Sequence, residues 1–103
     1  MQNKINVLLT GCGSPGGPGI IKSLELDDNI NVYAVDADSN ATGRLLSSNF
    51  FQIPRADNAK FIDKLLKICK KLEINVILPL VTMELLKLSK HIKSFEDIGV
   101  KVI

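Results

Sequence analysis

A glycine-rich stretch near the N-terminus holds the residue types and spacing that point most directly to chemistry. Residues 11–19 read GCGSPGGPG and contain five of the seven glycines. The first six satisfy GxGxxG, in which glycines let the backbone approach a pyrophosphate. Asp36 follows Gly16 by twenty residues, where an acid accepts hydrogen bonds from a ribose. The pattern indicates either a dinucleotide-binding site or only a tight turn between the first strand and the first helix, where glycine is needed for close packing.

Two prolines weaken the dinucleotide interpretation. Pro15 and Pro18 have no backbone N–H, so two positions of the loop cannot donate to a phosphate. Residues 16–19 also make the loop longer than the compact six-residue motif. We therefore expect poor phosphate binding, and we keep a stand-alone NAD(P)-binding module as the alternative function.

The other reactive side chains give weaker signals. Cys12 lies near a predicted helix N-terminus, where a thiolate is favoured, but no histidine is close in sequence to act as its base. Cys69 follows the apolar spacing of a predicted helix, which favours a position in the core. His91 lies among lysines, which favours a position on the surface. Arg44 and Arg55 are interpreted either as phosphate or carboxylate contacts or as surface residues. Neither cysteine belongs to a CxxC motif or to a Cys/His spacing typical of metal ligands. We therefore predict that both cysteines are reduced thiols and that the chain has no metal site.

Length and composition describe one soluble globular domain spanning residues 1–103. Of the 103 residues, 46% are hydrophobic and 23% charged, and the net charge is +2. This charge is too small for an electrostatic grip on nucleic acid or an anionic membrane. No apolar run approaches the ~20 residues of a membrane span, and the N-terminus lacks the apolar core of a signal peptide. We therefore expect a cytoplasmic protein that binds neither nucleic acid nor membrane.

The elements that must position these residues alternate between strands and helices. Apolar and β-branched runs predict strands at residues 5–10, 31–36, 50–53, 75–80 and 100–103. Helices are predicted to begin at Pro18, to occupy 41–48, to run from an N-cap at Asp57 through Leu72, and to occupy 84–95. This order predicts an α/β fold: a three-layer, doubly wound, Rossmann-like parallel sheet of about five strands in the order 3-2-1-4-5.

Three segments closely resemble the N-terminal domain of carbamoyl-phosphate-synthase-like ATP-grasp ligases, and the likeness extends over essentially the whole chain. They are the TGxGxPG loop at residues 10–16, VDADxNAxG at 35–43 and ILPxxxxE at 77–84. The resemblance implies a Rossmann-like pre-ATP-grasp domain that forms one wall of an active site and binds no nicotinamide cofactor.

In such ligases an ATP-grasp module follows in the chain, holds ATP and Mg²⁺, phosphorylates a carboxylate and lets an amine attack the acyl phosphate. The resemblance therefore implies a C-terminal ATP-grasp partner and a small-molecule substrate, with no cofactor, metal or catalytic residue in this chain. Relatives often have an acid at or beside position 82 or 83, where this chain has Thr82 and Met83, so Glu84 is the surviving acidic candidate. The residues expected at the substrate or nucleotide cleft are Gly11, Gly13, Ser14, Gly16, Gly17, Asp36, Asp38 and Glu84.

Three functions stay open at this point. The first is the substrate-cleft domain of an ATP-dependent ligase, inactive by itself. The second is the NAD(P)-binding module, and the third is a scaffold domain with no ligand. The apolar residues 100–103 read as a strand at a sheet edge, so we also expect the isolated chain to self-associate, with a homodimer as one form.

Overall fold

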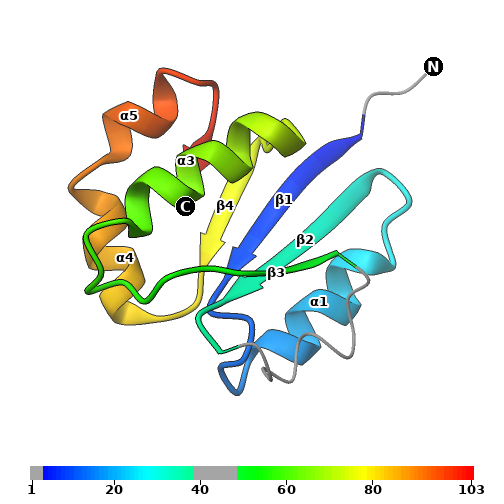
Figure 1. The fold of residues 1–103 in the computed structure, drawn as a ribbon. Coiled ribbons are helices and arrows are strands. Elements are labelled where there is room, and N and C mark those ends of the chain that lie inside the picture. Colours follow the sequence, from blue (N-terminus) through cyan, green and yellow to red (C-terminus); the bar gives the residue numbers. More distant parts are fainter. Residues whose placement is uncertain (1–3, 39–48) are drawn as a thin grey trace.

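A computed structural model describes residues 4–38 and 49–103. Its sheet has five parallel strands in the order β3-β2-β1-β4-β5 (Figure 1). The strands are β1 Ile5–Thr10, β2 Ile30–Asp36, β3 Phe50–Gln52, β4 Val76–Pro79 and β5 Lys101–Val102. The helices, labelled as in Figure 1, are α1 Gly17–Glu25, α3 Phe61–Leu72, α4 Thr82–Ser89 and α5 Ile92–Glu96. The predicted Rossmann-like fold class and strand order are confirmed.

Helices cover both faces of the sheet because side chains alternate along the central strand. Leu8 of β1 packs in a cluster with Phe61 and Leu65 of α3 and with Leu88 and Phe95 of α4 and α5. The next residue, Leu9, faces the opposite side and packs with Cys12 and with Ile21 of α1. Because successive side chains of a strand point to opposite faces of the sheet, the core consists of two clusters, one on each face. The sheet and the helices on its two faces form three layers.

The long helix α3 is amphipathic, as predicted. Its buried side chains are Phe61, Ile62, Leu65, Ile68 and Cys69, and the lysines 60, 64, 67, 70 and 71 are exposed. The predicted N-cap at Asp57 is wrong, because residues 58–60 form a turn before the helix. In that turn the Oδ1 atom of Asn58 accepts a hydrogen bond from the backbone N–H of Lys60, at 2.8 Å.

The single helix predicted over residues 84–95 is also wrong, because two helices occupy this region. The chain leaves α4 after Ser89, and His91 has non-helical backbone angles, with φ −125° and ψ 18°. The Ser89 hydroxyl donates to the carbonyl of Leu86 at 2.8 Å, a local bond that competes with helix continuation. Leu85 and Ile92 are exposed, although a continuous helix would place them on the same face as the buried Leu88 and Phe95.

The carboxyl ends of the strands meet at one edge of the sheet. The arrows of β1, β2 and β4 all point to the lower edge in Figure 1, where the glycine loop lies. Strand bounds agree with prediction to within two residues. The predicted helix at 41–48 and Arg44 lie outside the described residues. Among the described helices, none is both long and apolar enough to cross a lipid bilayer.

Candidate functional site

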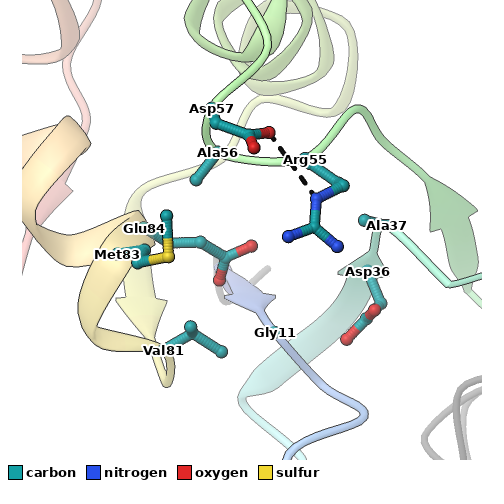
Figure 2. A pocket seen from close by; sticks show the side chains of 9 residues that line it. All are labelled: Gly11, Asp36, Ala37, Arg55, Ala56, Asp57, Val81, Met83 and Glu84. Atoms are coloured by element: carbon teal, nitrogen blue, oxygen red, sulfur yellow. Dashed lines mark ion pairs between the residues drawn. The ribbon is translucent and has the colours of Figure 1, made fainter.

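A small cleft opens at this carboxyl edge (Figure 2). Its volume is about 170 Å³, below the ~300–1,000 Å³ of pockets that enclose drug-sized ligands. The walls come from the ends of β1, β2 and β4, from the segment after β3 and from the first turn of α4. The lining residues are Gly11, Asp36, Ala37, Arg55, Ala56, Asp57, Val81, Met83 and Glu84.

Gly11 shapes the floor of the cleft and is required there for two reasons. Its φ of +67° lies in the left-handed region that side chains rarely adopt. A Cβ atom added at Gly11 would lie 2.5 Å from Val81 Cγ2 and 2.8 Å from Glu84 Oε1. The absence of a side chain therefore lets Val81 and Glu84 close over the end of β1.

Glu84 is the unusual side chain of the cleft, because it is a carboxyl group only 6% exposed. Among residues 4–38 and 49–103, its Oε1 atom has no hydrogen-bond partner, and neither does the buried Oγ1 of Thr10. Burial raises the pKa of Glu84 to about 7; the nearby Thr10 hydroxyl lowers it somewhat, and the charge of Asp36 raises it. Near neutral pH this carboxyl group therefore exchanges readily between its acid and its carboxylate.

Asp36 ties the glycine loop to the end of β2. One carboxylate oxygen accepts the backbone N–H of Gly13 at 2.8 Å, and the other accepts that of Asp38 at 2.9 Å. Further along the loop, the N–H groups of Ser14 and Gly17 donate to the carbonyls of Gly11 and Ser14, respectively. The loop amides are therefore largely engaged by the loop itself and by Asp36.

Arg55 supplies a positive charge at the mouth of the cleft. Its guanidinium group points into the space between Glu84 and Asp36 (Figure 2). Arg55 Nε lies 3.6 Å from Asp57 Oδ1, and these side chains are 74% and 62% exposed. An ion pair so open to water contributes little stability, so Arg55 is free to reorient toward a bound molecule.

The structure brings together only part of the predicted cleft set. Three of the predicted residues line the cleft: Gly11, Asp36 and Glu84. The backbone N–H of Gly13 donates a hydrogen bond to the carboxylate of Asp36. Gly17 instead begins α1, where a Cβ atom would collide with the carbonyl oxygen of Cys12. The remaining predicted residues, which do not line the cleft, are Ser14, Gly16 and Asp38.

Several wall residues were absent from the predicted cleft set, although Arg55 had been named as a candidate contact for a phosphate or carboxylate. The segment Arg55–Asp57 follows β3, and Val81 and Met83 follow β4. Their positions after strand ends were an available signal, because ligands in open α/β sheets bind at the carboxyl ends of strands.

The expectation that the position of Cys12 favours a thiolate is wrong. The side chain is buried against the sheet, and the pKa of its thiol is raised to about 12 by loss of hydration and by the charge of Asp36. Cys69 is buried in the core as predicted, and burial raises the pKa of its thiol to about 12 as well. Both are free thiols with little nucleophilic character.

Comparison with known protein families adds a decisive observation to this geometry. The family model of the PylC-like N-terminal domain matches residues 7–103. The chain belongs to this family. The PylC-like N-terminal domain is a pre-ATP-grasp domain of ATP-grasp ligases, which confirms the family suggested by the glycine loop and the ILPxxxxE segment. None of the curated proteins matches the chain significantly.

Solved structures similar to this PylC-like domain share its fold at low sequence identity. The dTDP-glucose 4,6-dehydratase of Bacillus anthracis, solved with NAD, matches with a TM-score of 0.68, 15% identity, and coverage of 95% of this chain and 36% of that one. A short chain dehydrogenase family protein of Francisella tularensis gives a TM-score of 0.62 and 18% identity, with coverage of 95% and 47%. The chain thus spans less than half of these proteins, and the likeness shows the fold alone.

Proposed function

We propose that this chain is the substrate-cleft domain of an ATP-grasp ligase that joins a carboxylate to an amine through an acyl phosphate, as carbamoyl-phosphate-synthase-like ligases do. In that reaction the carboxylate takes the terminal phosphoryl group of ATP. The amine nitrogen then attacks the acyl carbon, phosphate leaves, and the nitrogen loses a proton. The observation that carries the proposal is the family match over residues 7–103, together with the cleft at the carboxyl edge.

The proposal divides the work between two domains. We assign ATP and Mg²⁺ to an accompanying ATP-grasp domain, and to this chain the wall that receives a substrate. The volume of about 170 Å³ supports this division, because it suits one small functional group and is too small for a nucleotide. This chain is therefore expected to be inactive by itself.

The alternative NAD(P)-binding function has less support from the loop. Asp36, the residue that would accept hydrogen bonds from a ribose, already accepts two backbone N–H groups. The N–H groups of Ser14 and Gly17 are bonded within the loop, and Pro15 and Pro18 have none. Few donors are left for a pyrophosphate.

The test is an assay of this chain together with the ATP-grasp domain encoded with it. We expect release of ADP to require both domains, Mg²⁺, a carboxylate and an amine, and we expect hydroxylamine to trap the acyl phosphate as a hydroxamate. Full turnover by the ATP-grasp domain without this chain would contradict the proposal.

A further inference from the structure

A groove lies between α3 and the edge strand β3, and it shares no lining residue with the cleft at the carboxyl edge. One hollow of about 200 Å³ is lined by Phe51, Gln52, Lys64, Lys67, Ile68, Lys71 and Leu72. A second hollow of about 350 Å³ adjoins the first, because Lys64 and Lys67 line both. The remaining residues that line the second hollow are Pro54, Lys60 and Asp63. The proposed ligase function gives this groove no role.

The first hollow has an apolar floor. Phe51 of β3 is 38% exposed and lies there with Ile68 and Leu72 of α3. Both α3 residues pack against the hydrophobic core, so the floor is fixed in place by the fold. An exposed aromatic side chain beside a hollow is typical of sites that receive an apolar group from a partner.

The rim of the groove is positively charged. Lys64, Lys67 and Lys71 follow one another at spacings of three and four, so they lie along one side of α3. Within residues 4–38 and 49–103, none of the three ammonium groups forms an ion pair. Asp63 is the single acid among the described residues that line either hollow. The groove therefore complements a ligand that carries negative charge as well as an apolar group.

The strand beside the groove favours a polypeptide as that ligand. β3 is at one edge of the sheet, and β2 is its single neighbour among the described strands. The N–H of Ile53 donates to the carbonyl of Asp36 at 3.0 Å, so the backbone of the preceding residue, Gln52, points away from β2. A polypeptide offers backbone donors and acceptors at the spacing of such an edge, whereas nucleic acid and small anions do not.

We propose that this groove binds an acidic, extended segment of a partner protein. The segment pairs with β3 at Gln52 and inserts one apolar side chain against Phe51. Carboxylates two residues before and after that side chain point to the same face and contact the three lysines of the rim. These lysines also disfavour an uncharged or basic segment, because covering an unpaired ammonium group costs free energy. The proposal is independent of the ligase function, since it concerns a different part of the surface.

The experiment is an NMR titration of the 103-residue protein with the peptide acetyl-DSETLTESD-amide at low ionic strength. When this peptide is extended, its leucine and its acidic residues share one face. We expect saturable shifts of the Phe51, Gln52 and Lys67 amides, with a dissociation constant below about 1 mM. Absence of saturation at about 5 mM peptide would overturn the proposal.

Two further ligands identify the chemistry that the groove recognises. The amide analogue acetyl-NSQTLTQSN-amide has the same shape without charge and should bind at least about tenfold more weakly. An oligonucleotide of five thymidines has the same charge as the acidic peptide and should also bind more weakly, because it cannot pair with β3. Equal binding of the amide analogue, or binding of the oligonucleotide as tight as that of the peptide, would overturn the proposal.

Two variants separate the groove from a general effect of charge. Lys67→Glu changes a residue that lines both hollows and should weaken peptide binding at least about tenfold. Lys70→Glu makes the same change on the same helix, outside both hollows, and should bind within about threefold of the parent. Both lysines are exposed, so both variants should fold. Equal losses in the two variants would overturn the assignment to the groove.

Hydrogen exchange of the Gln52 amide tests the strand pairing without a substitution. Exchange of this amide should slow at least about tenfold in the complex, because its N–H gains a partner. Unchanged exchange with the peptide bound would overturn the pairing with β3.

A dilution series of the protein alone tests for a second copy of the chain as the occupant. We expect the Phe51 and Gln52 signals to be independent of protein concentration. Concentration-dependent shifts equal to those caused by the peptide would overturn the proposal in favour of self-association at this edge.

Discussion

The burial of Glu84 makes the stability of the domain sensitive to pH. The pKa rises from 4.5 to about 7 on folding, so the folded protein binds more protons than the unfolded chain between these values. Stability from this group is therefore fully present below pH 4.5, and it is lost as the pH rises toward and through 7. A shift of this size corresponds to a total loss of about 3 kcal/mol.

Glu84→Gln should remove this dependence. Because glutamine does not ionise, the variant should gain on the order of 2 kcal/mol relative to the parent between pH 5 and pH 8. Urea unfolding at the two pH values measures this difference. Parallel pH profiles for the two proteins would show that Glu84 titrates normally.

Gly11 and Gly16 test whether glycine is needed for conformation or merely present in the loop. Gly11→Ala should lower the free energy of unfolding by about 1–3 kcal/mol, because its φ of +67° is strained for alanine and the new Cβ meets Val81 and Glu84. Gly16→Ala is the matched control, since Gly16 has φ −82° and nothing lies within 4 Å of an added Cβ. Equal effects in urea unfolding would contradict this distinction.

At the scale of elements, residues 81–92 carry an exposed apolar surface, part of which borders the cleft. We call it the α4 surface; its large exposed apolar residues are Val81, Met83, Leu85, Leu86 and Ile92. Val81 and Met83 also line the cleft, so a partner resting on this surface would also cover the cleft. Several exposed apolar residues on one segment are typical of protein interfaces.

The α4 surface gives the expected self-association a specific location. The 103-residue chain should form dimers or larger species at high micromolar concentration, as measured by light scattering over a concentration series. Leu86→Lys should shift it toward monomer, because Leu86 is 58% exposed on this surface. Leu26→Lys is the control, since Leu26 is 86% exposed at the end of α1. Equal effects of the two substitutions would point to association elsewhere, such as pairing at the edges of the sheet.

At the scale of the whole molecule, the fold resembles that of a dehydratase solved with NAD, but several amide groups of the glycine loop are already hydrogen-bonded within this protein. We therefore expect NAD and NADP to leave the melting temperature unchanged. A true cofactor at a hundredfold excess over its dissociation constant adds about 2.7 kcal/mol, which is several degrees for a domain of this size. A shift of several degrees in thermal unfolding would favour the NAD(P)-binding alternative.

Much of the fold was predictable from local sequence. Strand periodicity, the glycine loop and the lysine-rich face of residues 61–72 determine the element order, because each depends on residues near one another in the chain. The two helix errors, at Asp57 and at residues 89–91, arose where a local turn replaced a helical hydrogen bond that periodicity cannot reveal.

The sequence by itself determined the α/β class, the strand order and the family, since all three follow from periodicity and from short motifs. Only the tertiary structure decided which of the predicted cleft residues meet. Gly11 and Glu84 are 73 positions apart, and their contact depends on β1 and β4 being neighbours in the sheet. The burial of Glu84, its raised pKa and its unpartnered oxygen also arise from distant residues packing together, because solvent exclusion and charge proximity are properties of the folded chain.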